Sequence, residues 1–254
     1  MTPTQTKRYA RHLVLKEIGG PGQNKLLASR LAIIGAGGLG GPAALYAAAA
    51  GIGHITIIDD DLVDLSNLQR QIQFSFNDIG QSKAKNLSAT LSALNSDLTL
   101  TSHNQRLTAE NAHKLLSGHD MIMDGTDSFE TRFLINQASY DLNIPLMSGA
   151  LGRFDGQVGL FNSSSDAPCY QCFVPSLPPH AETCSAVGVV GALAGVIGSM
   201  MSLEAIKYIT GAGESLAGSI YLYDGLQSQG RRVRLPKDPN CPVCSSPAEL
   251  TSTA

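Results

Sequence analysis

The chain has 254 residues, of which 43% are hydrophobic and 15% charged, with a formal net charge of −3 and a pI near 6.0. That length suffices for one large domain with a substantial core, whereas the weakly acidic balance gives no electrostatic reason to expect a nucleic-acid partner. Because residues 1–16 contain no apolar stretch long enough for a signal peptide, a cytoplasmic protein is expected.

Helices and strands are predicted to alternate through the first 150 residues. This alternation implies an α/β fold, a Rossmann-like, doubly wound and mostly parallel sheet with helices on both faces. The expected elements, in chain order, are a helical arm over 7–17, a β-α-β unit over 31–61 whose second strand is 54–58, a helix over 81–94, a strand over 98–102, a helix over 111–116, and strands over 121–123 and 144–148.

The character of the chain changes after Gly149. Residues 153–161 and 219–223 are predicted to be antiparallel strands that extend the sheet, and 175–180 to be a mobile loop. The Ser/Thr-rich residues 245–254 are expected to form a disordered tail. We expect a single domain over 1–244, with an N-terminal helical arm (1–25), a nucleotide-binding part (26–150) and a third part (151–244).

One segment is long enough to cross a membrane. No charged residue occurs from Thr183 to Leu203, which matches the length of a transmembrane helix. Serines and glycines dilute the run, however, and glycines 188, 191, 195 and 198 form a stripe along which another backbone can approach closely. A buried helix that ends at Gly211, with no membrane contact, is the favoured interpretation.

A glycine-rich loop after the first strand indicates a nucleotide site. Residues 31–40 read as an apolar strand, a tight turn and the start of a helix, and such a turn presents bare N–H groups to an anionic ligand. Asp59, at the end of the second strand, can accept hydrogen bonds from ribose hydroxyls. Together they predict binding of an adenine nucleotide.

The segment from Ser66 to Gln71 bears on which chemistry the nucleotide serves. The glycine pattern alone suggests an NAD-dependent dehydrogenase, which would leave Arg70 without a role. An ATP-using enzyme needs cations and amides around a phosphate chain, and Asn67, Gln69 and Arg70 supply them. A solvated surface arginine is the alternative for Arg70.

Two further residues suit a triphosphate site. Lys83 lies in the first turn of a predicted helix, whose dipole also attracts anions; a salt-bridged surface lysine is the alternative. Asp127 is expected to end a short strand at the ligand-binding edge of the sheet, where a carboxylate suits Mg²⁺ shared with ATP oxygens. Helix N-capping is the competing role for Asp127, and Asp124 or Thr126 could serve it too.

The five cysteines divide into two C-x-x-C pairs and a single residue. The pairs Cys169/Cys172 and Cys241/Cys244 could together close a tetrahedral zinc site. Redox-active pairs are the alternative, although neither pair is placed at a strand-to-helix start that would lower a thiol pKa. Cys184, before the uncharged helix, could be a small apolar side chain at a helix start.

Five segments, in this order, resemble the MoeB/ThiF (HesA) family, the bacterial relatives of ubiquitin-activating enzymes, over about residues 8–244. They are Gly35-Ala-Gly-Gly-Leu-Gly40, Asp59, Ser66-Asn-Leu-Gln-Arg-Gln71, Gly80-Gln-Ser-Lys83 and Asp124-Gly-Thr-Asp127. The chain looks closest to the molybdopterin-synthase adenylyltransferases, with the thiamine-pathway enzymes second. The resemblance implies ATP-dependent adenylation of the C-terminal glycine of a small ubiquitin-like sulfur carrier, which gives an acyl-adenylate and pyrophosphate for later thiocarboxylation.

The resemblance also implies ATP, Mg²⁺ and a structural zinc as cofactors, with the zinc on Cys169, Cys172, Cys241 and Cys244 in a carrier-binding part, 151–244. In relatives, the arginine matching Arg11 reaches the γ-phosphate of a partner subunit in a homodimer. A cysteine near Cys184 takes part in acyl or sulfur transfer in the thiamine-pathway relatives and the ubiquitin-activating enzymes, whereas molybdopterin-type relatives have a cysteine there without an established need for it. The implied catalytic residues are Arg11, Arg70, Lys83, Asp127 and Cys184. The implied nucleotide contacts are Gly35, Gly37, Gly38, Gly40, Asp59, Ser66, Asn67, Leu68, Gln69, Arg70, Lys83, Asp127 and Ser128.

The expected partners are a carrier that ends in Gly-Gly and a separate sulfur donor protein, because the chain ends at Ala254 without the sulfurtransferase domain of some longer relatives. Three alternatives stay open. They are a dehydrogenase, a relative that activates a small carboxylate (such as a tRNA-modifying cyclase), and a nucleotide-binding module without catalysis.

Overall fold

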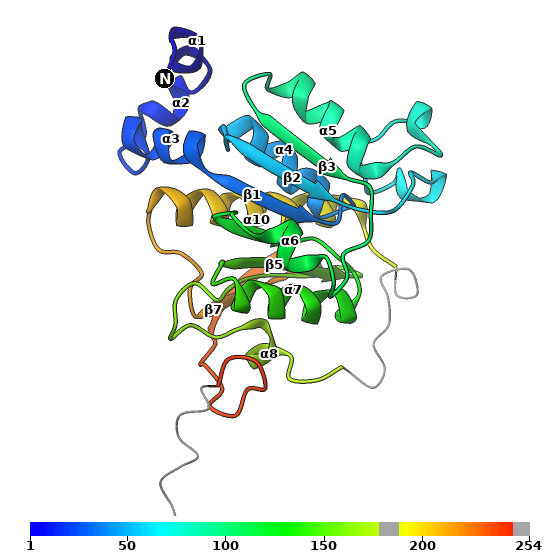
Figure 1. The fold of residues 1–254 in the computed structure, drawn as a ribbon, viewed down its shortest axis with the longest axis vertical. Helices are drawn as coiled ribbons and strands as arrows, with labels where there is room; N and C mark the ends of the chain where they lie inside the picture. The colour runs from blue at the N-terminus through cyan, green and yellow to red at the C-terminus, as the bar shows by residue number, and fades with distance from the viewer. Residues whose placement is uncertain (178–187, 246–254) are drawn as a thin grey trace, which may run out of the picture.

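One mixed sheet organises the molecule, of which the computed structural model describes residues 1–177 and 188–245 (Figure 1). Eight strands follow the order β3-β2-β1-β4-β5-β6-β7-β8. Pairs from β3 to β5 are parallel and pairs from β5 to β8 antiparallel, which confirms the predicted fold class. The strands are β1 Arg30–Ile34, β2 His54–Ile58, β3 Thr99–His103, β4 Met121–Asp124, β5 Leu146–Gly152, β6 Asp155–Phe161, β7 Ser219–Asp224 and β8 Gln229–Arg234.

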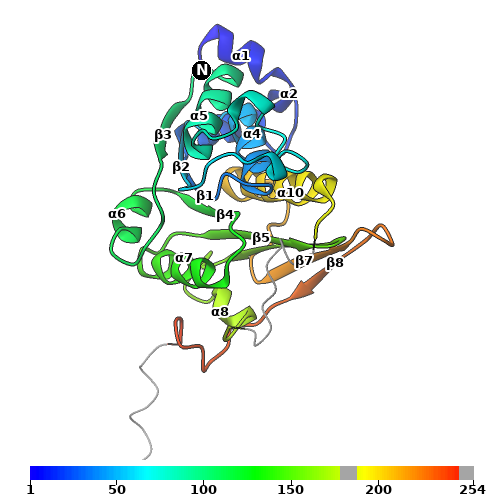
Figure 2. The ribbon, with the colours of Figure 1, turned by 90° about the vertical axis from the view of Figure 1, so that its right-hand side faces the viewer.

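Helices cover both faces of the parallel half of the sheet (Figures 1 and 2). Helices α4, α5 and α10 lie on one face, and α6 and α7 lie on the other. The helices are α1 Pro3–Arg8, α2 Ala10–Leu13, α3 Gly19–Ala28, α4 Gly40–Ala50, α5 Lys83–Leu94, α6 Ala112–Leu116, α7 Phe129–Asp141, α8 Tyr170–Phe173 and α10 Gly191–Thr210, with short 3₁₀ turns η1 Leu65–Asn67 and η2 Phe76–Asp78.

Strand residues alternate between the two faces, which explains the unbroken apolar runs in the sequence. Leu31 and Ile33 of β1 belong to the core cluster under α4 and α10. Ala32 and Ile34 belong to the cluster under α6 and α7. Because successive side chains point to opposite faces, a strand covered on both sides has to be apolar at every position.

The helix that was predicted to end at Gly211 is α10, Gly191–Thr210, with Gly211 as its C-cap. Within the described residues it begins at Gly191, because Gly188 has φ +77° and Val189 bridges to Arg153 instead. The resulting α10 has the length and apolar composition of a membrane span. It packs on α3, α4, β5 and β6, however, so its buried side is part of the core of the fold. The first residues of the uncharged run, 183–187, lie outside the described residues.

The N-terminal arm is not the single helix that the sequence suggested. It breaks at Tyr9, whose ring is 3% exposed and accepts a hydrogen bond at its hydroxyl from Asn95 Nδ2 at 3.0 Å. A Cβ added to Gly51 would lie 2.6 Å from that ring. Burial of Tyr9 against the body therefore separates α1 from α2. The unpredicted α3 follows.

The antiparallel half also departs from prediction in two places. The strand expected over 153–161 begins at Asp155, because Arg153 has φ +49° and starts the turn between β5 and β6. The edge strand β8 was not predicted, since every one of its residues is exposed and three are arginines. Its pairing with β7 creates it. The remaining predicted elements are present with shifted ends.

Candidate functional site

A cavity of about 360 Å³ lies at the carboxyl ends of β1 and β4. Connections leave this point toward opposite faces of the sheet, through α4 on one side and α7 on the other, which is where open α/β sheets bind ligands. The sequence-predicted residues that line it are Gly35, Gly37, Gly38, Asp59, Asn67, Arg70, Lys83, Asp127 and Ser128.

The glycine-rich turn needs its glycines for close backbone contacts. Gly35 has φ +86°, and a Cβ there would lie 3.0 Å from the Gly125 carbonyl oxygen. A Cβ on Gly40 would lie 1.7 Å from the Gly35 carbonyl oxygen. Gly40 therefore does not line the cavity but closes the turn, which lets α4 begin directly behind it.

Asp59 is held by the same turn. Its carboxylate accepts hydrogen bonds from the backbone N–H groups of Ala36 at 2.7 Å and Asp61 at 2.8 Å. Burial raises the pKa of Asp59, an effect that these two hydrogen bonds and Lys83 oppose. The carboxylate is thus fixed beside the first amides of the loop, with lone pairs left for a ligand.

Of the four cationic residues that line the cavity, Lys83 and Arg70 are the two that the sequence predicted. Lys83, 5% exposed at the first position of α5, donates to Asp61 Oδ2 at 2.8 Å. Arg70 is partly exposed, and its Nη1 donates to the Ser66 carbonyl oxygen at 3.1 Å. The ion-pair alternative for Lys83 therefore holds in part, because the lysine is paired but it is buried at the cavity and not on the outer surface.

Asp127 does not end the strand, as was expected, but lies in the loop that follows it. The strand β4 ends at Asp124, and Asp127 is exposed in the loop that follows. Ser128 is the N-cap of α7, since its side chain accepts from the Thr131 N–H. The capping role considered for Asp127 is therefore filled by its neighbour, and the carboxylate of Asp127 lies at the cavity without that task.

Several predicted contacts lie elsewhere. Ser66 donates its hydroxyl to Asp64, and Leu68 packs on the core. Gln69 is exposed, and so is Arg11, on the N-terminal arm. None of these four lines the cavity of this chain. Cys184 lies outside the described residues.

Several lining residues have no role predicted from the sequence, among them two buried polar ones, Gln71 and Arg132. Gln71 is 3% exposed, and its side-chain oxygen has no hydrogen-bond partner among the described residues. Arg132, on α7, is 5% exposed and also reaches the cavity wall. Gln71 belongs to the polar segment that the sequence singled out, whereas a lone arginine in a helix carries no such signal.

The two C-x-x-C pairs converge beside α7, where Asn136 contacts Cys169. The Sγ atoms of Cys169 and Cys241 are 3.4 Å apart, those of Cys172 and Cys244 are 3.3 Å apart, and all four lie within 4.8 Å of one another. A tetrahedral zinc–thiolate centre has S···S separations of roughly 3.8 Å. Burial raises the pKa of Cys169 to about 11, whereas burial of Cys241 is outweighed by hydrogen bonds from backbone N–H groups, which lower the pKa of that thiol. The donor set fits zinc.

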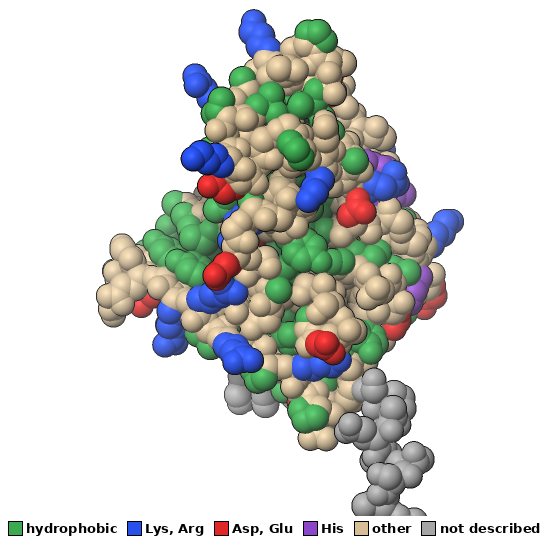
Figure 3. Space-filling view, turned by 90° about the vertical axis from the view of Figure 1, so that its left-hand side faces the viewer, with side chains coloured by type: hydrophobic (Ala, Val, Ile, Leu, Met, Phe, Trp, Pro, Cys, Tyr) green, Lys and Arg blue, Asp and Glu red, His purple; other side chains and the backbone are tan. Residues whose placement is uncertain are grey.

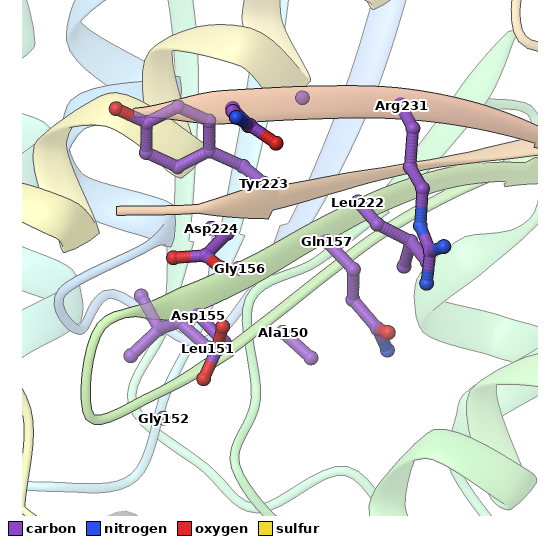
Figure 4. Close-up of a pocket in the computed structure, with 12 residues that line it drawn as sticks. Ala150, Leu151, Gly152, Asp155, Gly156, Gln157, Leu222, Tyr223, Asp224 and Arg231 are labelled. Atoms are coloured by element: carbon purple, nitrogen blue, oxygen red, sulfur yellow. The ribbon is translucent and has the colours of Figure 1, made fainter. Parts of the chain in front are cut away.

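A second cavity, of about 620 Å³, lies across the antiparallel half of the sheet (Figure 4). Gln157, Leu222 and Arg231 are directly opposite one another on β6, β7 and β8, and Figure 4 shows Gln157 and Arg231 projecting on the same side. Glycines 152, 156 and 230 also line this second cavity, which we call the groove. Leu151 lines both the groove and the first cavity, so the two are neighbours at this residue.

Comparison with known proteins places the chain among described relatives. The model of the ThiF family matches residues 9–243. The sulfur carrier protein adenylyltransferase of Thermus thermophilus is 39% identical over 249 residues, which cover 96% of this chain and 92% of the relative. The SAMP-activating enzyme E1 of Haloferax volcanii is also 39% identical, over 243 residues that cover 95% of this chain and 89% of the relative.

Longer relatives and solved structures match as well. The adenylyltransferase and sulfurtransferase MOCS3 of Anopheles gambiae is 43% identical over 96% of this chain but only 56% of its own length. The crystal structure of E. coli MccB with ATP has a TM-score of 0.82 at 22% identity, with 94% of this chain and 75% of that chain covered. At that identity, the structural likeness concerns the fold alone.

Proposed function

The chain belongs to the ThiF family, and from this premise we propose that it uses ATP to adenylate the C-terminal glycine of a small ubiquitin-like sulfur-carrier protein. The products are an acyl-adenylate, which is ready for thiocarboxylation, and pyrophosphate. The observation that carries the proposal is the meeting of the glycine-rich turn, Arg70, Lys83 and Asp127 in one cavity. The activities named for the relatives support the same function.

Adenylation requires that the carboxylate be positioned at the α-phosphate and that negative charge there be neutralised. A C-terminal carboxylate is already ionised at neutral pH, so its attack on the α-phosphate requires no general base. The obstacle is repulsion between two anions, together with the negative charge that develops on the phosphoryl oxygens. Arg70, Lys83 and the N–H groups of the glycine-rich turn supply positive potential around the phosphates, with Asn67 beside them. Asp59 binds the ribose.

Asp127 is the residue proposed to hold Mg²⁺. It is an exposed carboxylate that lines the cavity, and hard oxygen ligands suit this cation. When bound, Mg²⁺ supplies neutralising charge to the oxygens of ATP and of pyrophosphate. Zinc on the four cysteines is proposed to be structural, because the cluster lies away from the cavity-lining residues.

The groove across β5 to β8 is proposed to receive the carrier. An extended Gly-Gly tail is narrow, and the groove is next to the nucleotide cavity at Leu151, which lines both. Asp155, Asp224 and Arg231 provide charged groups along its length. We propose that the carrier body rests on the antiparallel strands while its tail passes Leu151 toward the α-phosphate.

A homodimer is part of the proposal. The arm exposes Arg11 together with the apolar side chains of Val14 and Leu15, and Ile72 and Phe76 are exposed next to the Arg70 segment. Hydrophobic side chains also gather on the face below the arm (Figure 3). A second subunit would bury such surface and could bring Arg11 to the neighbouring phosphate chain. A cytoplasmic location, a separate sulfur donor and a transfer role for Cys184 are also proposals.

The test is incubation with ATP, Mg²⁺ and candidate carriers that end in Gly-Gly, followed by mass analysis for the carrier adenylate. A carrier that lacks its last glycine serves as the control. Adenylate on the intact carrier alone supports the proposal. Exchange of pyrophosphate into ATP without any carrier would indicate activation of a small carboxylate instead, and binding of NAD(H) without exchange would indicate a dehydrogenase.

A further inference from the structure

Two buried charged side chains fasten the loop between β4 and α7. Asp124, 1% exposed, accepts hydrogen bonds from the N–H and the hydroxyl of Thr126 at 2.9 and 2.6 Å, and from the Ser148 hydroxyl at 2.8 Å. Arg132, 5% exposed, donates to Ser148 Oγ at 3.1 Å, to the Gly149 carbonyl at 2.8 Å and to the Thr126 carbonyl. The two charged groups are 3.5 Å apart.

This arrangement ties three elements together. Asp124 ends β4, Ser148 and Gly149 belong to β5, and Arg132 belongs to α7. A planar guanidinium with several N–H groups in a fixed fork can bridge such partners, whereas an ammonium group cannot reproduce the geometry. The loop is also pressed onto the glycine-rich turn, since a Cβ on Gly125 would lie 2.8 Å from the Gly40 nitrogen.

The charge of Arg132 is already matched, although the residue lines the cavity. Its partner Asp124 is fully buried and hydrogen-bonded on both oxygens. Lys83 differs, because its partner Asp61 has a side chain that is 68% exposed and can be hydrated when the lysine turns to a phosphate. Arg132 is therefore less suited than Lys83 to act as a phosphate counter-ion.

We infer that Arg132, together with Asp124, is a positioning residue for Asp127. By holding the carbonyl of Thr126 and the strand β5 at once, it fixes the loop of residues 125–128 and sets where the Asp127 carboxylate meets the metal–nucleotide complex. This inference rests on the proposed function, in which Asp127 holds Mg²⁺ bound with ATP.

The experiment measures binding of a non-hydrolysable ATP analogue by calorimetry, without carrier, at graded Mg²⁺ concentrations. Arg132→Lys keeps the charge and loses the fork. We expect the Mg²⁺ concentration for half-maximal binding to rise about tenfold, as for outer-shell partners of metal ligands, while binding measured without Mg²⁺ stays within about twofold. The same change on an Asp127→Asn background should add little, because the group being positioned is gone.

A second pair of variants guards against misfolding. Ser148→Ala removes one partner of the Arg132–Asp124 pair without touching the cavity wall and should shift the Mg²⁺ requirement in the same direction. Ser139→Ala removes a comparable buried hydrogen bond, from the Ser139 hydroxyl to the Ile144 carbonyl at 2.6 Å, and should leave that requirement unchanged.

Three outcomes overturn the inference. An unchanged Mg²⁺ requirement in both Arg132→Lys and Ser148→Ala would overturn the positioning role of Arg132 but not the proposed function. An equal loss of binding with and without Mg²⁺ would do the same. Failure of the unaltered protein to bind the analogue at any Mg²⁺ concentration would overturn the proposed function as well.

Discussion

The ammonium group of Lys83 donates to Asp61 Oδ2 at 2.8 Å, with the lysine side chain 7% exposed and the aspartate side chain 68% exposed. The cation is thus held at the cavity by a carboxylate that water can reach. Such a pair adds little to stability, because the exposed partner is well solvated without it. The Lys83–Asp61 pair instead places a positive charge where a phosphate would bind.

Lys83→Met should therefore affect activity far more than stability. We expect carrier-dependent exchange of pyrophosphate into ATP to fall by about 10²- to 10³-fold, as when one preorganised transition-state donor is removed. The melting temperature should change little. The control is Lys85→Met, an exposed lysine on the same helix that does not line the cavity. Equal losses in the two variants would argue against a specific role for Lys83.

Arg70→Ala should abolish the same exchange, with a loss of at least about 100-fold, while circular dichroism shows an intact fold. The comparison is Gln69→Ala, since Gln69 is the exposed neighbour that does not line the cavity. Its exchange rate should stay close to that of the unaltered protein. Full activity in Arg70→Ala would remove the guanidinium from the mechanism.

Two glycines of α10 should respond in opposite directions to alanine. A Cβ on Gly198 would lie 2.5 Å from the Leu39 carbonyl oxygen, whereas nothing lies within 4 Å of a Cβ on Gly195. Gly198→Ala should destabilise by about 1–3 kcal/mol, the usual cost of overpacking. Gly195→Ala should stabilise by about 0.5–1 kcal/mol, because alanine favours the helix. Urea unfolding measures both, and equal effects would contradict the packing of α10 on α4.

Metal analysis should find about one zinc per chain, held by four thiolates. Asn136, 0% exposed on α7, donates from Nδ2 to Cys169 Sγ at 3.6 Å. Asn136→Leu should lower zinc affinity in chelator competition by about 10- to 100-fold, because this amide orients a ligand. Asn162→Ala, in the same buried amide network but not bonded to sulfur, is the control. Much less than one zinc with four free thiols would refute the assignment.

Stability should fall as the pH drops below the ordinary histidine value. His54 and His119 flank Thr56 at the end of the sheet opposite the cavity, and burial, together with Arg30, lowers the pKa of both. As the pH falls, the histidines of the unfolded chain, with pKa values of about 6.5, bind protons at a higher pH than those of the native protein. The free energy of unfolding therefore decreases below about pH 6.5 and is insensitive to these groups above about pH 7.5.

Urea unfolding at pH 5.5 to 8 measures this slope. Replacing both histidines by glutamine should flatten it, whatever the change in stability at pH 8. A double variant with the slope of the unaltered protein would show that other groups are responsible.

Much of the fold could be predicted because short local patterns in the sequence specify individual strands and helices. The apolar runs at Leu31–Ile34 and around Ile122 required strands covered on both faces, and the structure has them. The break at Tyr9 could not be predicted, because it depends on Asn95 and Gly51 far along the chain. The strand β8 is likewise invisible in its own sequence, since only pairing with β7 makes it a strand.

The candidate site divides in the same way. Nine predicted residues line the cavity, and each had been singled out by its own loop, strand end or helix start. Arg132 had not, because its hydrogen-bond partners come from β5 and from the loop after β4. The groove across the antiparallel strands was also unforeseen, since its lining residues align only through strand register.

By itself the sequence determined the chemistry available to this protein, namely a turn for phosphates, two cations, an acidic loop and two thiol pairs, because residue type and close spacing specify these features. The tertiary structure alone decided that the cations and the acidic loop face one cavity, that the thiol pairs meet, and that Arg132 holds the loop bearing Asp127. These relations depend on contacts between distant segments, which form only when the sheet and its covering helices are packed together.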